Sequence, residues 1–217
     1  MNEQKTTATR SLLPEPTLRR LPWYLSYVGM LENKGVGTVS STQISKELNV
    51  DASQIAKDLS FLNIKGKTRI GYDVPTLRRS LVEFLGFECS HNAVVIGSGS
   101  LGRALMQDAG LAQYGLSIVA GFDVNPAIVG TKVCGIPIYD ISELKARLEK
   151  LHVGIAILSV PVEHSQRVAD LAIASGIEAI WNFTPYRIKA PQHIALANTS
   201  IYAHLAIMYN RMSHGTK

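Results

Sequence analysis

Cysteine is scarce in this sequence, and long apolar runs are missing. The chain has 217 residues and two cysteines, Cys89 and Cys134, whose separation fits neither a secreted disulfide framework nor a compact zinc or thiol-redox motif. No apolar run approaches the roughly 18 residues that cross a bilayer. The polar first ten residues also lack the apolar centre of a signal peptide. We therefore expect a cytoplasmic protein with reduced thiols that does not act at a membrane.

Basic residues are concentrated in the first third of the chain. Residues 1–79 contain 12 Lys or Arg against 7 Asp or Glu, whereas residues 80–217 contain 10 of each kind. An excess confined to one segment favours a polyanionic partner for that segment, because contacts to phosphates release condensed counterions. A solvated basic face is the alternative interpretation.

The pattern of apolar residues changes close to residue 86. Before it, short helical patterns dominate. From Asn92 onward, runs of Val, Ile and Ala alternate with helix-length amphipathic stretches, which is typical of strand-crossover-strand units around a parallel sheet. We predict an α/β protein with an N-terminal domain over residues 1–86, a second domain over residues 87–199 and a C-terminal helix in residues 200–217.

The first domain has the pattern of a winged helix-turn-helix. A helix predicted over residues 19–33 precedes two short helices, and the second of these begins at Asp51, which has capping-box spacing to Gln54. Small polar side chains on its outer face suit the major groove, and the basic loop after it suits a wing that contacts phosphate or the minor groove. A helical hairpin that serves only for packing is the alternative. The predicted DNA contacts are Ser41, Ser53, Gln54, Lys57, Ser60, Lys65, Lys67 and Arg69.

The second domain opens with a dinucleotide-binding pattern. A buried strand ending at Ile96 runs directly into Gly97-Ser98-Gly99-Ser100-Leu101-Gly102, and a helix pattern follows. In such a loop the first glycine makes the turn, the second lets the pyrophosphate approach, and the third allows close packing of helix on strand. This context predicts a Rossmann-type domain that binds NAD.

Asp123 ends the next predicted strand, 21 residues beyond Gly102. A carboxylate there accepts hydrogen bonds from the adenosine ribose and repels a 2′-phosphate, so NAD is favoured over NADP. The alternative role for Asp123 is a turn cap. Val124 follows it in the predicted cofactor site.

Two further strand ends complete the predicted site. Ser159-Val160-Pro161 and Asn182-Phe183-Thr184-Pro185 follow later strands, so we expect both loops to line the nicotinamide side of the crevice. Neither supplies an obvious catalyst. His164 is the one nearby acid or base, and an exposed or capping role is its alternative. We predict no catalytic residue and no metal site.

Collinear segments along nearly the whole chain match one protein family. They include Arg20-Leu21-Pro22, Lys57-Asp58-Leu59-Ser60, Ile70-Gly71-Tyr72-Asp73-Val74, Gly97–Gly102, Gly121-Phe122-Asp123-Val124 and Asn182-Phe183-Thr184-Pro185. In these segments the sequence resembles the redox-sensing transcriptional repressor Rex family. The resemblance implies a homodimeric repressor that occupies operator DNA with NAD⁺ and leaves it when NADH binds.

The resemblance also assigns a role to the C-terminal helix, which reaches across to the partner protomer in that family. Here Ile201, Leu205, Met208 and Met212 repeat at spacings of four and three, a stripe that could dock in a groove. Packing on its own sheet is the alternative.

Some positions depart from the family pattern. The resemblance implies an Arg where Ala56 stands. It also implies a relay of an Arg, a Tyr and an Asp that reports cofactor state, but Ser26, Asp108 and Ser200 stand at those positions, so we expect the usual relay to be absent. Other functions also remain open. These are an NAD-dependent oxidoreductase with an accessory helix-turn-helix, and a domain that holds CoA or another adenine nucleotide.

Overall fold

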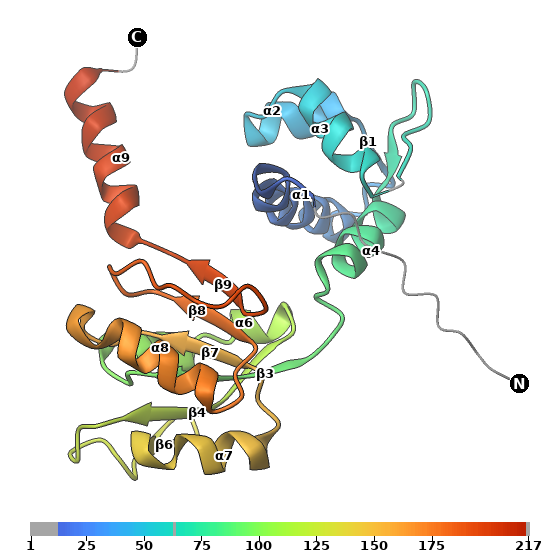
Figure 1. Cartoon of the computed structure of the whole chain (residues 1–217). Helices are drawn as coiled ribbons and strands as arrows, with labels where there is room; N and C mark the ends of the chain where they lie inside the picture. The colour runs from blue at the N-terminus through green and yellow to red at the C-terminus, as the bar shows by residue number, and fades with distance from the viewer. Residues whose placement is uncertain (1–12, 63, 216–217) are drawn as a thin grey trace, which may run out of the picture. The chain divides into compact units, whose positions relative to one another are not determined.

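The computed structural model describes residues 13–62 and 64–215, and the chain divides into two compact units after Glu88. The division lies two residues beyond the predicted boundary at 86. Gly86 ends helix α4 (Val74–Leu85) in the left-handed conformation, but Phe87 still packs on the core of the first unit. The C-terminal helix belongs to the second unit by this division. Figure 1 shows the elements of both units along the chain.

The first unit is a winged helix-turn-helix, as predicted. Its helices are α1 (Glu15–Asn33), α2 (Ser41–Leu48), α3 (Ala52–Ser60) and α4. Helix α1 begins four residues before the predicted start at Arg19, because Pro16 is suited to the first turn of a helix. Apolar side chains from all four helices form one core, which includes Leu21, Ile44, Leu59 and Leu77.

The turn between α2 and α3 is fixed by caps. Asn49 ends α2 in the left-handed conformation, and the Asp51 carboxylate accepts hydrogen bonds from the backbone N–H groups of Ser53 and Gln54. The predicted capping box at Asp51 is wrong in its second half, because the Gln54 side chain turns to Asp58 instead. The structure forms a capping box one helix earlier, between Ser40 and Gln43.

A small antiparallel ladder supports the wing. Strands β1 (Thr38–Val39) and β2 (Tyr72–Asp73) pair, and the exposed loop before β2 is closed by reciprocal backbone hydrogen bonds between Lys67 and Gly71, each 2.8 Å long. A Cβ on Gly71 would lie 2.4 Å from the backbone oxygen of Val39, so only glycine fits where the wing meets the ladder.

The second unit contains a seven-stranded sheet in the order β5-β6-β4-β3-β7-β8-β9, parallel except for the β5–β6 pair. After β6 the chain crosses to the far side of β3 to form β7, so the topological switch of this doubly wound sheet lies between β3 and β7. The strands are β3 (His91–Ile96), β4 (Leu116–Asp123), β5 (Lys132–Val133), β6 (Ile136–Asp140), β7 (Ile155–Leu158), β8 (Ala179–Asn182) and β9 (Ala195–Asn198).

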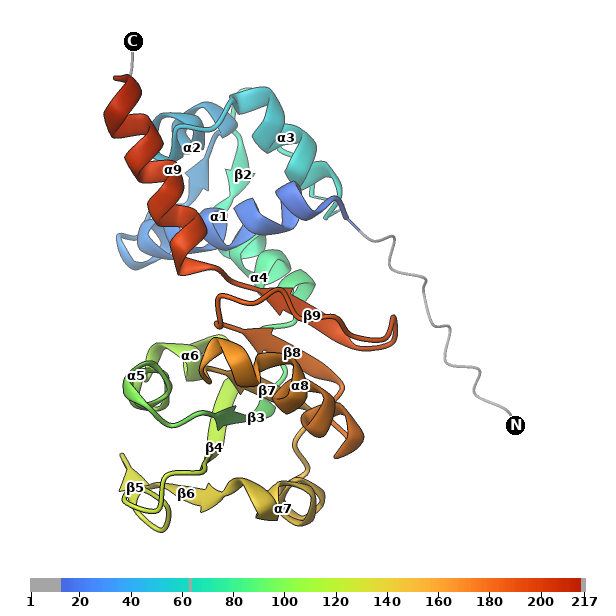
Figure 2. The ribbon, with the colours of Figure 1, turned by 60° about the vertical axis from the view of Figure 1, so that its left-hand side comes forward.

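Helices cover both faces of this sheet (Figure 2). On one face, α7 and α8 pack with Val94 and Ile96; on the other, α5 packs with Ala93 and Val95. Alternate residues of β3 therefore serve two separate cores, which explains its uninterrupted apolar run. The elements between the strands are α5 (Ser100–Gln107), α6 (Gly110–Gln113), the 3₁₀ turn Ile141–Glu143, α7 (Leu144–Leu151), the 3₁₀ turn Val162–His164 and α8 (Ser165–Ala174).

Helix α9 (Ile201–His214) follows the edge strand β9. Its first turn is capped by the Ser200 hydroxyl, which accepts from the backbone N–H of Ala203. Of the predicted stripe, Ile201, Met208 and Met212 are exposed at 47%, 53% and 77%, so this helix does not pack on its own sheet. The packing alternative for α9 is wrong.

Candidate functional site

The glycine loop joins β3 to α5 at the centre of the sheet. Gly97 has φ +94°, and a Cβ on it would lie 2.6 Å from the backbone oxygen of Ser159. A Cβ on Gly102 would lie 2.1 Å from the backbone oxygen of Gly97. Both positions therefore exclude any larger residue, and this brings the first turn of α5 against the carboxyl end of β3.

The N-terminus of α5 presents backbone donors to ligand. Gly99 is its N-cap, no side chain caps the helix, and a Cβ on Gly99 would meet no atom within 4 Å. The first N–H groups of a helix have no partner within it and carry partial positive charge, which suits a pyrophosphate. Of the other loop residues, Ser98 is buried, Ser100 is exposed and Leu101 is partly buried.

Asp123 lies at the carboxyl end of β4 beside this loop. Its Oδ2 accepts from the backbone N–H of Ser98 at 2.7 Å, and its Oδ1 accepts from those of Val124 and Asn125 at 2.8 and 2.9 Å. The carboxylate is therefore a turn cap and also ties β4 to the glycine loop. Since a carboxylate has about four acceptor positions, about one remains for a ribose hydroxyl.

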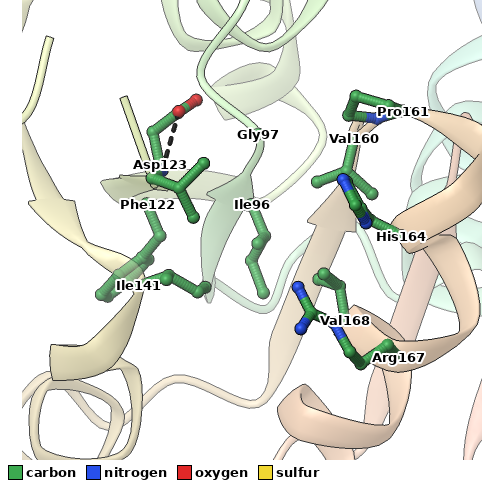
Figure 3. A pocket seen from close by; sticks show the side chains of 11 residues that line it. Ile96, Gly97, Phe122, Asp123, Ile141, Val160, Pro161, His164, Arg167 and Val168 are labelled. Atoms are coloured by element: carbon green, nitrogen blue, oxygen red, sulfur yellow. Dashed lines mark hydrogen bonds between the residues drawn. The ribbon is translucent and has the colours of Figure 1, made fainter. Parts of the chain in front are cut away.

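A hollow of about 120 Å³ opens beside Asp123. Figure 3 shows Asp123, Phe122 and Ile141 on one side of it, and Val160, His164 and Val168 on the other. Its walls are mostly apolar, with a few polar groups at the rim, which is the usual construction of a small-molecule site. The residues that line it are Ile96, Gly97, Phe122, Asp123, Val124, Ile141, Val160, Pro161, His164, Arg167 and Val168.

Two residues of the strand-end loops line this pocket. Val160 and Pro161 share the hollow with Asp123, and their expected place on the nicotinamide side of the crevice stays a prediction. They share it because β7 and β4 both neighbour β3, so the carboxyl ends of these strands flank the same loop. Ser159 lies behind them, and its hydroxyl donates to the backbone oxygen of Gly97 at 2.7 Å.

The loop after β8 does not line this pocket. Asn182 and Thr184 are buried, and the Asn182 amide donates to the backbone oxygen of Tyr186 and to Asn198 Oδ1. Phe183 is partly buried against Trp181, with ring centroids 4.7 Å apart, and Pro185 is exposed. A cofactor role for Asn182–Pro185 stays a prediction.

His164 lies at the rim of the same pocket, at the end of a 3₁₀ turn, and is exposed. It therefore faces the Asp123 end of the crevice. An acid or base for hydride transfer is needed beside the nicotinamide, so this placement does not favour the oxidoreductase alternative. Sequence reasoning missed Arg167 and Val168, which the spacing of one helical turn from His164 could have indicated.

Within the residues that the structure describes, no group of three or more His, Cys, Asp or Glu side chains is arranged to hold a metal ion. In that same part of the chain, no helix is long and apolar enough to cross a membrane.

Helix α3 carries half of the predicted DNA contacts. Ser53, Lys57 and Ser60 are exposed on its outer face. The Ser53 hydroxyl donates to Asp51 at 2.5 Å and that of Ser60 to the backbone oxygen of Lys57 at 2.7 Å, which leaves both hydroxyls free to accept. Ser41 is partly buried at the start of α2.

Behind this face lies a buried carboxylate that sequence reasoning did not assign a role. Asp58 is fully buried and accepts hydrogen bonds from Thr17, Arg20 and Tyr24 of α1. Gln54 Nε2 also donates to it, at 2.8 Å. Its place next to Leu59, on the buried side of α3, was the available signal.

The charge state of this cluster follows from its contacts. Burial alone would raise the pKa of Asp58, but the hydrogen bonds from Arg20, Tyr24, Gln54 and Thr17 outweigh it and hold that pKa below its usual value. Burial, and then the bond to Asp58, raise the pKa of the Tyr24 hydroxyl. Asp58 is therefore an ionised carboxylate that can only accept hydrogen bonds, and the bonds that it accepts from α1 hold α3 against that helix.

The wing carries three exposed cations, Lys65, Lys67 and Arg69. Arg69 has φ +65°, within the turn closed by the Lys67–Gly71 bonds. The turn gathers the three basic residues on one short exposed loop, which suits contact with a phosphate backbone.

The three predicted relay positions have local roles in the structure. Asp108 ends α5 and accepts from the backbone N–H of Gly110 at 2.7 Å. Ser200 caps α9, and Ser26 is exposed on α1. The absence of the family's relay of Arg, Tyr and Asp at these positions stays a prediction.

Fold and site together define the class: a winged helix-turn-helix protein with a doubly wound dinucleotide-binding domain. Residues 13–60 match the family model of a putative DNA-binding protein N-terminus, and residues 89–186 match that of a CoA binding domain. Similar proteins include "Redox-sensing transcriptional repressor Rex" of Bacteroides fragilis, 54% identical over 98% of this chain and 97% of the relative. The same-named protein of Porphyromonas gingivalis is 53% identical over 96% and 98%. The chain belongs to the redox-sensing transcriptional repressor Rex family.

Solved structures agree with this assignment. RSP in complex with β-NAD⁺ and operator DNA has a TM-score of 0.89 and 30% identity, covering 94% of both chains. RSP in complex with β-NADH has a TM-score of 0.85 and 31% identity, covering 94% of this chain and 95% of that one. The relatives from Bacteroides fragilis and Porphyromonas gingivalis are named as transcriptional repressors, and RSP is described as a Rex-family repressor.

Proposed function

We propose that this chain is a DNA-binding transcriptional repressor that senses the balance of NADH and NAD⁺. One observation carries the proposal: a glycine loop of dinucleotide type and an exposed recognition face with a basic wing occur on one chain. The likeness to RSP, which was solved with NAD⁺ and operator DNA, supports both halves. Such a protein would act in the cytoplasm, where it meets both chromosomal DNA and the free cofactor.

The two cofactor forms differ in ways that a pocket can distinguish. The nicotinamide ring is planar and cationic in NAD⁺, whereas in NADH it is neutral and puckered. A ligand moves a two-state protein only by its differential affinity for the two states, and a nearly complete switch needs a difference of about 5.5 kcal/mol. We infer that NAD⁺ favours the DNA-bound state and NADH the released state.

The groups of the site would each contact a different part of the cofactor. The N–H groups at the start of α5, beyond Gly99, would hold the pyrophosphate. Asp123 would accept from the adenosine ribose, and Val124 and Val160 would flank the adenine. No residue is assigned a catalytic role.

We further propose that the working form is a homodimer joined through α9. Most apolar side chains of this helix are exposed, including Tyr202, Ile207 and Tyr209 besides the predicted stripe. A helix that is apolar on most of its surface is stable in water only when a partner covers it. A second copy of the same chain supplies that partner symmetrically.

The dimer can be tested by charge insertion. Met208→Glu should shift the chain towards monomer in sedimentation-velocity measurements, because a carboxylate would be buried in the interface. Ala203→Glu, on the opposite side of α9 from Met208, is the matched control and should sediment like the wild type. If both variants remain dimeric, α9 is not the interface.

The central experiment is a DNA-binding titration against the cofactor ratio. An operator selected from a random duplex library is labelled, and its binding to the full chain is followed by fluorescence anisotropy with NAD⁺, with NADH and with neither. We expect NADH to weaken binding at least tenfold relative to NAD⁺. Equal affinity with both cofactors would remove the sensing proposal and leave the DNA proposal standing.

Two separate experiments test the alternative functions, CoA binding and NAD-dependent oxidation or reduction. Competition calorimetry between NADH and CoA tests whether the family-model match to a CoA binding domain reflects the ligand. Turnover of NADH on a panel of carbonyl substrates, with wild type and His164→Ala, tests the oxidoreductase alternative. We expect NADH to outcompete CoA and neither protein to turn over NADH.

A further inference from the structure

The side chain of Gln54 is held in one orientation on the recognition face. Its Nε2 donates to Asp58 Oδ1 at 2.8 Å, one helical turn further along α3. Gln54 itself is partly buried, and Asp58 is fully buried. The bond therefore lies on the inner side of the amide, towards α1.

The amide group cannot rotate by 180° without losing this arrangement. The Asp58 carboxylate already accepts from Arg20 at 2.6 and 2.8 Å and from Tyr24 at 2.8 Å, so it stays ionised and can only accept. A rotated Gln54 would turn its Oε1 towards two carboxylate oxygens. Because two acceptors facing one another repel, and the rotated amide would lose its hydrogen bond to Asp58, one orientation is fixed.

The other end of the amide is free. Among the residues that the structure describes, Gln54 Oε1 has no hydrogen-bond partner, while no buried side-chain oxygen or nitrogen there lacks one. Gln54 Oε1 is therefore not buried. It presents a lone acceptor on the third residue of α3, close to the helix N-terminus that enters the major groove in helix-turn-helix proteins.

An acceptor on this face selects among bases by their amino groups. In the major groove, adenine and cytosine each present an exocyclic amino donor, whereas guanine and thymine present only acceptors and a methyl group. An unrestrained glutamine can turn either end of its amide to a base and so meet donors or acceptors. The hydrogen bond from Gln54 Nε2 to Asp58 fixes the amide, so the oxygen Oε1 is the end that faces a base.

We propose that Gln54 reads one base of each operator half-site by accepting a hydrogen bond from the exocyclic amino group of adenine or cytosine, with Asp58 as its positioning residue. The inference rests on the proposed function, since it names the base chemistry that the DNA-binding face takes. The second hydrogen of Nε2 can also donate to adenine N7, an acceptor that cytosine lacks. A contribution of N7 to binding therefore distinguishes adenine from cytosine as the base that Gln54 reads.

Base analogues test the proposal atom by atom. The full chain, with NAD⁺ present, is titrated against its selected duplex. In parallel duplexes, single adenines are replaced by purine and single cytosines by 2-pyrimidinone, each of which lacks the amino group. We expect one position per half-site where loss of the amino group weakens wild-type binding about tenfold, the size of one specific base contact. Gln54→Met should bind the unmodified duplex about tenfold more weakly and be indifferent to the analogue there.

Matched variants keep the result interpretable. Lys57→Met should weaken binding to all duplexes similarly and retain the sensitivity to the amino group. Asp58→Asn should lower the preference at the Gln54 position while leaving Gln54 in place. If Asp58→Asn fails to fold, Gln54→Met, which removes one hydrogen bond to Asp58 but keeps those from Arg20, Tyr24 and Thr17, still decides the question.

The failing outcomes separate the two proposals. If the wild type selects no duplex, the DNA-binding function falls, and this inference falls with it. If the wild type binds a duplex but Gln54→Met senses every amino group as the wild type does, only the role of Gln54 is overturned. It is also overturned if Gln54→Met loses sensitivity to 7-deazapurines alone, because Gln54 would then act as a donor.

Discussion

Arg20 on α1 and Asp58 on α3 form a two-point ion pair: Nε donates to Oδ2 at 2.6 Å, and Nη2 donates to Oδ1 at 2.8 Å. Two parallel bonds fix direction as well as distance, so the pair sets how the recognition helix lies on α1. Tyr24 and Thr17 complete the set of donors from α1. The helix that presents Lys57 and Gln54 is thus held by a buried charge.

Removing that charge should destabilise the first unit. Asp58→Ala leaves the guanidinium of Arg20, whose side chain is 20% exposed, without its partner, and a broken pair of this kind costs about 3 kcal/mol. The loss is measured by urea unfolding followed by circular dichroism, with hydrogen exchange on peptides from α1 and α3. Glu15→Ala, which breaks an exposed pair with Arg19, is the control and should unfold like the wild type. An Asp58→Ala chain as stable as that control would contradict the prediction.

The Asp58 carboxylate should also make the free energy of unfolding depend on pH. Since the pKa of Asp58 is lowered on folding, its contribution is complete above the ordinary value of 3.8 and is lost as pH falls through the lower folded value. The wild-type free energy of unfolding should therefore decrease between about pH 5 and pH 2 more steeply than that of Asp58→Asn. Urea midpoints at several pH values measure both slopes. Parallel slopes would show that the folded pKa of Asp58 is not lowered.

The glycine loop offers a pair of substitutions with different outcomes. Gly99→Ala should fold normally, because its Cβ meets nothing within 4 Å, yet bind NADH more weakly, because that Cβ occupies the approach to the pyrophosphate. Gly102→Ala should lose both stability and binding, since its Cβ would lie 2.1 Å from the backbone oxygen of Gly97. Thermal unfolding and NADH calorimetry separate the two effects. Normal NADH affinity in Gly99→Ala would place the pyrophosphate elsewhere.

Asp123 should control the choice between NADH and NADPH. Asp123→Ser removes the carboxylate that repels a 2′-phosphate, so the affinity for NADPH should rise relative to that for NADH by at least tenfold. The absolute affinity for NADH should fall, because the backbone N–H of Ser98 also loses its acceptor. Fluorescence titration with both cofactors measures the ratio. An unchanged ratio would limit Asp123 to its role as a turn cap.

Much of the fold and part of the site were predictable because they depend on local pattern. The apolar runs located β3, β4, β7 and β8 but not β5, β6 or β9, and the glycine spacing located the loop between β3 and α5. The start of α1 and the partner of Gln54 were not predicted. Capping-box spacing at Asp51 and the i,i+4 pair with Asp58 compete for the same Gln54 side chain, and the outcome depended on what surrounds Asp58 in three dimensions.

The sequence by itself determined that this chain has a basic helix-turn-helix segment, a dinucleotide loop and an apolar last helix, since each is written in residues close together along the chain. Only the tertiary structure decided that Val160 and Pro161 lie opposite Asp123, and that the face of Gln54 open to solvent is an acceptor. The first follows from strand order, which brings together carboxyl ends from distant segments. The second follows from burial, which commits Asp58 to accepting and so leaves the Gln54 amide one orientation.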